Sequence, residues 1–342
     1  MYHLNFCITD KCNQNCIHCF VNPNQCNFNG LEENFIIGLC EKAVRFGLKS
    51  VHIFGGEPFL RPDLKNICEK LNELKINISI ATNGHFLNPE QVEWIEKFNI
   101  FLTISLHGTE KIHDEIANMQ GSFKTTLNNI KYLLNKKIKF AITTCVNKLN
   151  MESYPSLLQE LTKIGIKNFI ILYFSPIGRG MELIDYIISN EEWEQFIFDV
   201  QRFKWKLDPE IEISFEPSIF NRKYINLFTY RQQWASCQIN YKNNFVIDAN
   251  GDVYPCILLL RDKRYLLGNV LKSDIIEIYN KDLTLSINSA YDIPNTCLNC
   301  NLFDLCKSGC IAYKGKGNID FRCNPQNKNY ALLCPLFTKI LY

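Results

Sequence analysis

The stretch Cys12-Asn-Gln-Asn-Cys16-Ile-His-Cys19 places three thiols on one short segment, directly after an apolar run, His3–Thr9, that predicts a β-strand. Three thiolates on one loop are one ligand short of the four that structural zinc or a [4Fe–4S] cube normally takes. One iron of a cube would then stay open for a substrate or cofactor. The alternative is a structural zinc site completed by Cys26 or His18.

Downstream of this stretch, short β-type runs alternate with amphipathic helical runs, which predicts parallel βα units. The predicted strands are His3–Thr9, Ser50–Phe54, Asn77–Ala81, Ile100–Ser105, Lys139–Val146 and Asn168–Phe174. The predicted helices are Leu31–Phe46, Asp63–Leu74, Pro89–Phe98, Ser122–Asn135, Met151–Ile164 and Glu191–Lys206. This order predicts an α/β fold, a partial (β/α)6 TIM barrel, with an open doubly wound sheet as the less favoured alternative. Function in either fold sits on the loops after the strands.

Length and composition restrict the class of protein. The 342 residues suggest about two domains. A net charge of +2 offers no electrostatic footprint for nucleic acid, and no run is long and apolar enough to predict a membrane span. The N-terminus lacks the pattern of a signal peptide, which favours the cytoplasm. In that reducing compartment, 16 cysteines favour metal binding or redox chemistry over disulfides.

The pattern changes after the helix at about residues 190–207, which Asp208-Pro209 ends. We expect a barrel over residues 1–210, a linker over 211–235 and a second domain over 236–342. Phe245–Cys256 predicts a hairpin that turns at Asn250-Gly251. The Cys-rich end beyond Pro294 has little hydrophobic periodicity, so metal clusters are expected to order it. Four other cysteines are expected to be core thiols: Cys7, Cys40, Cys68 and Cys145.

The three-cysteine segment resembles the fingerprint of the radical S-adenosylmethionine (SAM) enzymes, which follows the first strand of a partial barrel. Further motifs at the ends of the next strands strengthen the resemblance. They are Gly55-Gly56-Glu57-Pro58, Thr82-Asn83-Gly84, Ser105-Leu-His107-Gly108, His113-Asp114 with Gly121-Ser-Phe123, and Pro176-Ile-Gly-Arg-Gly180.

The resemblance implies roles for these residues. Cys12, Cys16 and Cys19 would hold a [4Fe–4S] cluster whose open iron chelates the amino and carboxylate groups of SAM. The motif Gly55, Gly56, Glu57 and Pro58 would hold the methionyl amino group, with Glu57 as acceptor. Three further residues are expected at the SAM site: Asn83, Ser105 and Asn147. Ser105 and Asn147 can equally be simple strand-end caps, and His18 is expected to pack beside the adenine.

One position departs from the family pattern. Relatives often carry an arginine where this chain has Ala117. Any contact which that arginine makes elsewhere, to the SAM carboxylate or to substrate, must be supplied differently here or be absent.

The C-terminal cysteines resemble the SPASM extension of radical SAM enzymes, which holds two auxiliary [4Fe–4S] clusters. A zinc ribbon is the alternative. By resemblance, Cys237, Cys256 and Cys310 bind the inner cluster, and Cys297, Cys300 and Cys306 bind the outer one. Cys323 is favoured over Cys334 to close the outer cluster. Cys334 would then complete the inner cluster or be a free thiol, which would leave an inner iron open.

The implied chemistry is reductive cleavage of SAM to methionine and a 5′-deoxyadenosyl radical, which abstracts hydrogen from a substrate. Three [4Fe–4S] clusters and SAM are the expected cofactors, and a flavodoxin or ferredoxin is the expected reductant. Most SPASM-type relatives act on peptides, so we expect a maturase that cross-links (thioether, carbon–carbon or ether), epimerises or oxidises a ribosomally made peptide. The sulfatase-oxidising branch is less favoured because Ile257 follows Cys256 where that branch carries Asp.

Two alternatives remain at this stage. The chain reaches its first predicted strand within a few residues of Met1, so a leader-binding domain is not expected before it. Either a separate protein binds the leader, or the enzyme acts on a small molecule such as a tetrapyrrole side chain, a sugar or a nucleoside. A non-enzymatic iron–sulfur carrier is the distant third hypothesis.

Overall fold

The computed structural model describes residues 3–22, 30–216, 220–221, 239, 245–281, 293–300, 303, 310–313 and 330–331. Five cysteines discussed above lie outside the described residues: Cys26, Cys237, Cys306, Cys323 and Cys334. The assignments that depend on them therefore stay predictions.

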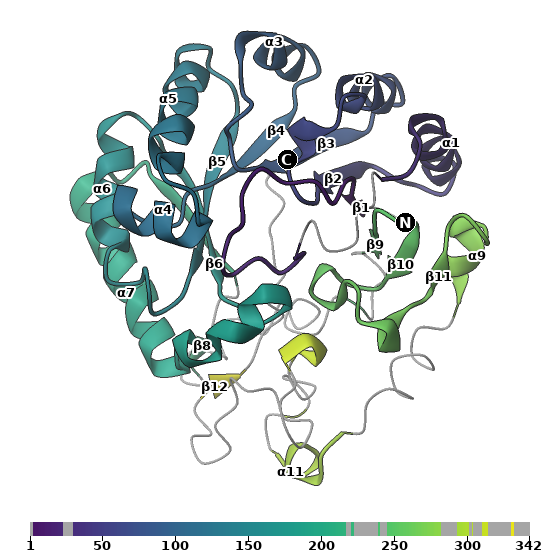
Figure 1. Ribbon diagram of the computed structural model, residues 1–342. Coiled ribbons are helices and arrows are strands. Elements are labelled where there is room, and N and C mark those ends of the chain that lie inside the picture. Colours follow the sequence, from purple (N-terminus) through teal and green to yellow (C-terminus); the bar gives the residue numbers. More distant parts are fainter. Residues whose placement is uncertain are drawn as a thin grey trace.

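A curved parallel sheet with helices on its outer face forms most of the molecule (Figure 1). Its strands are β1 (His3–Cys7), β2 (Ser50–Phe54), β3 (Asn77–Thr82), β4 (Phe101–Ser105), β5 (Phe140–Val146), β6 (Asn168–Tyr173) and β7 (Glu212–Glu216). The helices are α1 (Glu33–Val44), α2 (Leu64–Glu73), α3 (Pro89–Lys97), α4 (Glu110–Ala117), α5 (Ser122–Asn135), α6 (Tyr154–Lys163) and α7 (Asn190–Leu207). Each strand from β1 to β7 pairs in parallel with the next, which confirms the partial barrel.

Helical periodicity explains how the outer layer packs. In α2 the buried side chains are Leu64, Ile67, Cys68 and Leu71, spaced so that they form one stripe along the helix. At α7 the sequence supplies a capping box, in which the Ser189 side chain accepts from the Glu192 backbone and Glu192 accepts from Ser189. Buried stripes of this kind close the core between the helices and the sheet.

Two barrel elements differ from the sequence expectation. The stretch 211–235, expected as a linker, begins with β7, which continues the sheet in parallel beside β6. Its alternating pattern in Glu212–Glu216 carries only two apolar residues, so the periodicity is weak. The short helix α4, not expected from the sequence, follows β4 and buries His113, Asp114, Ile116 and Ala117. Buried polar residues on its inner face hide its amphipathic pattern.

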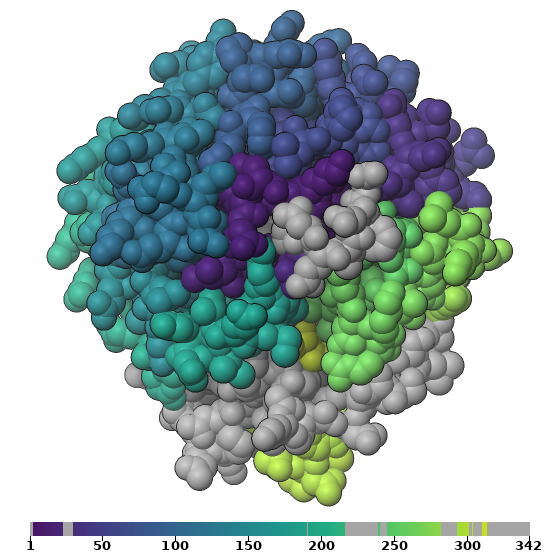
Figure 2. Space-filling view, viewed as in Figure 1, coloured from purple at the N-terminus to yellow at the C-terminus, as the bar shows by residue number. Residues whose placement is uncertain are grey.

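The C-terminal part of the chain returns to the first strand. Strand β9 (Phe245–Ile247) pairs in parallel with β1, and β10 (Asp252–Tyr254) pairs antiparallel with β9. The hairpin turn expected at Asn250-Gly251 is confirmed, with Gly251 at φ +85°. Strand β11 (Gly268–Asn269) pairs with β10 at the edge of the sheet. Figure 2 shows this green segment beside the purple N-terminal segment on the molecular surface.

Short elements complete the described structure. They are the 3₁₀ turns η1 (Pro58–Leu60), η2 (Gly178–Tyr186), η5 (Ile257–Leu259), η6 (Lys263–Tyr265) and η7 (Ile311–Tyr313), the helices α9 (Ile275–Asn280) and α11 (Asn295–Leu298), and the pair β8 (Phe220–Asn221) with β12 (Tyr330–Ala331). Among the described residues, no helix has the length and hydropathy that crossing a membrane requires.

Candidate functional site

A cavity of 1650 Å³ occupies the inside of the barrel. It runs the length of the barrel, from Cys12, Cys16 and Cys19 at the carboxyl ends of the strands to Lys75, Asn99 and Lys167 at the opposite ends, and Ile257 and Leu258 line its C-terminal side. Typical ligand pockets measure about 300–1,000 Å³. The cavity can therefore hold more than one small molecule.

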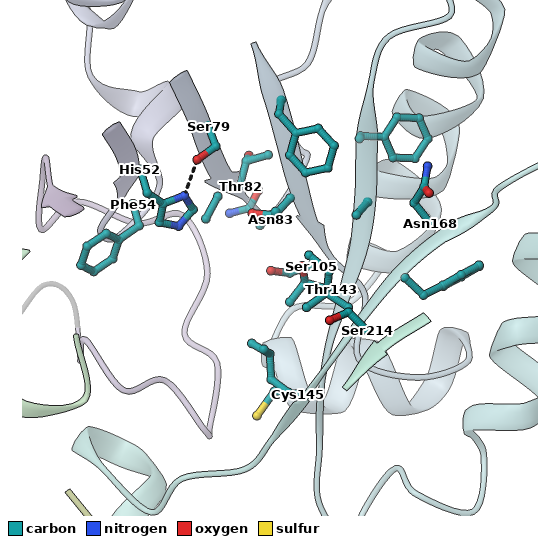
Figure 3. A pocket seen from close by; sticks show the side chains of 18 of the residues that line it. His52, Phe54, Ser79, Thr82, Asn83, Ser105, Thr143, Cys145, Asn168 and Ser214 are labelled. Carbon is teal, nitrogen blue, oxygen red and sulfur yellow. Dashed lines mark hydrogen bonds between the residues drawn. The ribbon is translucent and has the colours of Figure 1, made fainter. Parts of the chain in front are cut away.

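Small side chains on the inner face of the strands explain the space. Closed barrels are filled by bulky branched residues, whereas here the strands point Ser79, Ser105, Thr143, Cys145 and Ser214 inward, as Figure 3 shows. Of the four cysteines expected in the core, three are buried, but Cys145 lines this cavity, which corrects that expectation.

The three-cysteine loop (residues 12–19) follows β1 and crosses the carboxyl end of the barrel. Its backbone is held by α4, because the Asn15 amide donates to the Ala117 carbonyl at 3.3 Å and the Ile17 amide donates to Ile116 at 2.9 Å. From the loop after β6, the Arg179 amide donates to the Cys19 carbonyl at 3.0 Å. Two separate parts of the barrel thus fix the backbone between the thiols.

Side chains of the same loop are tied to β3 and α5. The Asn83 amide donates to Asn13 Oδ1 at 2.7 Å, and the Gln14 amide donates to Ser122 Oγ at 2.8 Å. His85 completes this network through contacts with Asn13 and Gln14, both at 3.2 Å. Asn83 therefore lies at the site as expected, and in this structure its side chain holds the loop.

Gly55 and Gly56 are required by contact with the start of the loop. A Cβ on Gly55 would lie 2.4 Å from the Thr9 carbonyl oxygen, and one on Gly56 would lie 2.2 Å from that of Lys11. Gly55 also has φ +148°, which favours glycine. The Gly56 amide donates to Thr9 at 2.8 Å. The two glycines line the cavity, and they also attach the end of β2 to Thr9 and Lys11, just before the three-cysteine loop.

Glu57 is completely buried, and its carboxylate has three donors within the protein. Oε1 accepts from Thr82 Oγ1 at 2.8 Å and from the Phe59 amide at 3.2 Å, and Oε2 accepts from the Asn83 amide at 2.8 Å. Burial raises the pKa of Glu57 to about 7, although these hydrogen bonds oppose the shift. In this structure Glu57 ties the loops after β2 and β3 together, a role that its expected contact with the SAM amino group did not include.

The remaining expected SAM residues separate into two groups. Ser105, at the end of β4, lines the cavity. Within the described part of the chain, the cavity lining does not include Pro58 or Asn147, which are both buried. Asn147 Oδ1 accepts from the Leu149 amide at 2.8 Å, the geometry of a strand-end cap, while its Nδ2 is buried without a hydrogen-bond partner.

Electrostatics and unpaired polar atoms fit a bound cluster and a polar ligand. Burial raises the pKa of Cys12 to about 11 and raises that of Cys16 further, so the bare thiols stay protonated until a metal displaces the protons. Three residues that line the cavity have buried polar atoms without a hydrogen-bond partner: His18 Nδ1, Thr143 Oγ1 and two nitrogens of Arg179. Such atoms favour a polar occupant. His18 packs edge-on against His107, with ring centroids 4.4 Å apart.

The described C-terminal cysteines differ in burial. Cys256 and Cys310 are 6% and 7% exposed and belong to the main hydrophobic core. Cys297 and Cys300 are half-buried, on and beside α11, a helix with no buried residue. In Figure 1, α11 lies at the margin of the molecule, far from β1. The four thiols thus form a buried pair and a peripheral pair.

Arg261 connects the N-terminal and C-terminal parts. Its guanidinium donates to both carboxylate oxygens of Asp248, at 2.9 and 3.0 Å, and forms an ion pair with Asp10. It also donates to the Val21 carbonyl at 2.9 Å. Asp10 and Val21 flank the three-cysteine loop, whereas Arg261 lies in the segment that follows Cys256. The cation therefore attaches this segment to both ends of the loop.

Sequence reasoning did not identify this ion-pair group or the role of Arg179. Asp10, Asp248 and Arg261 are far apart in the sequence, and no local spacing links them. Arg179 is part of the Pro176–Gly180 motif. A single basic residue in a loop after a barrel strand is the signal in the sequence that could have identified it.

The chain is similar to known proteins over most of its length. It is 28% identical over 329 residues to the cysteine-type anaerobic sulfatase-maturating enzyme of Clostridium novyi, which covers 88% of this chain and 85% of that protein. It is 23% identical over 324 residues to the AdoMet-dependent heme synthase of Methanosarcina barkeri, with 89% of each covered. Streptococcus suis SuiB, solved with its precursor peptide SuiA, superposes with a TM-score of 0.79 at 22% identity, over 94% of this chain and 75% of SuiB.

Two family models match the chain. Residues 6–161 match the radical SAM superfamily, and residues 237–301 match the SPASM iron–sulfur cluster-binding domain. The first match contains the three-cysteine loop and the ends of β1 to β5, and the second contains Cys256 and α11. The chain therefore carries a radical SAM domain followed by a C-terminal SPASM domain, and it is an enzyme that uses SAM and [4Fe–4S] clusters.

Proposed function

We propose that this enzyme modifies a ribosomally made peptide by forming a cross-link, epimerising a residue or oxidising one. The observation that supports this best is the mixed lining of the cavity where the thiols lie, which polar strand ends share with Ile257 and Leu258. Its walls combine polar residues at the strand ends with apolar side chains from η5. A peptide segment, which has a polar backbone and apolar side chains, matches such a surface.

The relatives support the same substrate class. The sulfatase-maturating enzyme of Clostridium novyi acts, by its name, on a protein, and SuiB binds a precursor peptide. The side chain that follows Cys256 separates this chain from the sulfatase pattern, because Ile257 presents an apolar group to the cavity. An apolar group cannot accept a proton there, so the reaction on the bound residue is expected to differ.

The cysteines divide into three proposed ligand sets. Cys12, Cys16 and Cys19 would bind the cluster that cleaves SAM, which supplies the 5′-deoxyadenosyl radical for hydrogen abstraction. The buried pair Cys256 and Cys310, with Cys237, fits the inner auxiliary cluster. The peripheral pair, Cys297 and Cys300, with Cys306 and either Cys323 or Cys334, fits the outer one.

The protein's own residues would orient these groups. Asn83 holds the three-cysteine loop through Asn13, Glu57 holds the Asn83 backbone from the end of β2, and Ser105 presents its hydroxyl to the cavity. The apolar side chains of Ile257 and Leu258 would exclude water near the reacting atoms. A flavodoxin or ferredoxin as reductant, a separate leader-binding protein and a cytoplasmic location are part of this proposal.

The test uses the full chain, purified anaerobically and reconstituted with iron and sulfide. It is incubated with dithionite, SAM and the product of any short reading frame that genome sequencing finds beside its gene. We expect the peptide to increase 5′-deoxyadenosine release and to change in mass or in residue configuration, as measured by mass spectrometry and chiral amino-acid analysis. Cys16→Ala is the matched control, in which both signals should vanish.

A second incubation replaces the peptide with a propionate-bearing iron porphyrin, because the heme synthase of Methanosarcina barkeri is also similar to this chain. If the porphyrin is consumed and the peptide is unchanged, the peptide proposal is wrong and the small-molecule alternative replaces it.

A further inference from the structure

The C-terminal end of α4, which lies at the three-cysteine loop, carries no cation of its own. Ala117 is fully buried at this point, and the last turn of α4 contains no basic residue. Its carbonyl accepts from the Asn15 amide, so the end of α4 lies directly against the three-cysteine loop.

Arg179 reaches the same part of the loop from β6. Its guanidinium Nη1 donates to Asn15 Oδ1, and Asn15 is the residue whose amide contacts Ala117. Gly178 makes this approach feasible, because a Cβ there would lie 2.5 Å from the Phe20 carbonyl oxygen. The loop after β6 therefore delivers a cation one residue away from the position of Ala117.

The free side of this guanidinium has the geometry of an anion site. Nε and Nη2 of Arg179 are buried without a hydrogen-bond partner, and the described residues offer no carboxylate that pairs with Arg179. These two nitrogens form the side of the guanidinium that binds a carboxylate through two parallel hydrogen bonds. Arg179 is half-buried, and two buried donors without a partner are costly unless a ligand satisfies them.

The charge of Arg179 acts within the cavity that holds the thiols. Arg179 lines that cavity together with Cys12 and Cys16. The Arg179 amide also donates to the Cys19 carbonyl at 3.0 Å, and its guanidinium donates to Asn15 of the same loop. The guanidinium is therefore close enough to the three-cysteine loop to influence a ligand bound there.

We propose that Arg179 binds the carboxylate of SAM through Nε and Nη2, in place of the arginine that relatives carry at the position of Ala117. It is a binding residue for the cofactor, and the substrate plays no part in the inference. The inference therefore holds or fails independently of the peptide proposal.

The test measures equilibrium binding of SAM and of decarboxylated SAM to the reconstituted full chain without reductant. Wild-type protein should prefer SAM, because iron and Arg179 both contact the carboxylate. Arg179→Gln should weaken SAM binding about tenfold or more, the size of one charge-assisted contact, and leave the binding of decarboxylated SAM unchanged. The ratio of the dissociation constant of decarboxylated SAM to that of SAM should therefore fall by the same factor. Arg202→Gln, which alters an exposed arginine on α7, is the matched control and should change neither value.

Two further variants separate binding from support of the loop. Arg179→Lys keeps the charge but loses the paired donors, so its loss should be smaller. Adding Ala117→Arg to Arg179→Gln should restore the preference for SAM. The proposal is overturned if Arg179→Gln leaves the preference for SAM unchanged. It is also overturned if both Arg179 variants lose cluster iron, because Arg179 would then only hold the loop.

Discussion

The three-cysteine loop and the segment around α11 each carry closely spaced cysteines, but the protein holds them in different ways. The loop is attached to α4, β3, α5 and the loop after β6 by hydrogen bonds of backbone and side chains. In α11 no residue is buried, and Leu298 is 53% exposed. The described backbone bonds of Cys297 and Cys300 are local, at 2.8 and 3.0 Å, to Pro294 and Cys297.

This difference indicates which of the two cysteine segments needs a bound metal cluster in order to fold. A loop that many barrel residues hold can present its thiols in a fixed arrangement before iron arrives. A four-residue helix without a buried face cannot be stable alone, so its cluster must contribute to folding. On the proposed ligand sets, packing would hold the three-cysteine loop and a cluster would hold the segment around α11.

The largest effect is expected from Cys16→Ala. Removal of one of three ligands should reduce SAM cleavage to background, while the auxiliary clusters persist, so that iron falls from about twelve to about eight per chain. Product analysis and iron determination measure both quantities. Cys40→Ala, at a buried position in α1, is the control. Continued SAM cleavage would contradict the ligand assignment.

Arg261→Gln tests whether the loop also depends on the C-terminal part. The substitution leaves the Asp10 and Asp248 side chains, which are 1% and 2% exposed, buried without their cation. We expect unfolding to become easier by about 3–5 kcal/mol, measured by urea denaturation.

Two variants check this result. Arg264→Gln breaks an exposed pair with Asp262 and should cost less than about 1 kcal/mol. Asp248→Asn should recover part of the loss in Arg261→Gln. Equal effects of Arg261→Gln and Arg264→Gln would mean that the ion-pair group does not connect the two regions.

The variant Glu57→Gln tests the burial of Glu57 through the pH dependence of the free energy of unfolding. Burial raises the folded pKa of Glu57 to about 7, above its usual 4.5, so the folded state binds more protons between these values. Wild-type stability relative to Glu57→Gln should therefore rise as the pH falls from 8 to 5, by on the order of 2 kcal/mol. Urea denaturation of both proteins at each pH gives the difference, from which the other titrating groups cancel. If the difference in unfolding free energy between the two proteins does not change with pH, the Glu57 carboxylate is exposed to solvent in the folded protein.

Removal of iron gives the smallest expected effect and the most direct comparison. In the iron-free protein, amide hydrogen exchange at residues 297–300 should accelerate about tenfold more than at residues 12–19, because only the latter keep their barrel contacts. Exchange followed by mass spectrometry measures both segments in one sample. Equal acceleration would show that iron also prepares the three-cysteine loop.

Much of the barrel could be predicted because its elements are local and periodic. The strand Ser50–Phe54 and the helix Ser122–Asn135 match their predicted bounds. Strand β7 alternates polar and apolar residues over only five positions, a pattern too short to stand out in the sequence, and it forms by pairing with β6. Helix α4 was missed because its buried face includes His113 and Asp114, which the protein satisfies through Ser122 and through the backbone of Gly121 and Phe123.

The site was predictable in its residue types and less so in its contacts. Spacing identified Cys12, Cys16 and Cys19 as one group, and the structure brings them to one cavity. The three internal donors of Glu57 depend on the approach of β2 to β3, and sequence alone does not determine that distance. The same holds for Arg261, whose partners lie in other parts of the chain.

The pairing of β1 with β9 affects how the chain is made. Asn5 binds Phe245 across 240 residues of sequence, which a ribosome needs roughly 10–50 s to synthesise at ~5–20 residues per second. During that interval β1 has an unpaired edge, and the loop that follows it lacks Arg261. The contacts that Arg261 and β9 make with this end of the molecule can therefore form only after most of the last third of the chain has been synthesised.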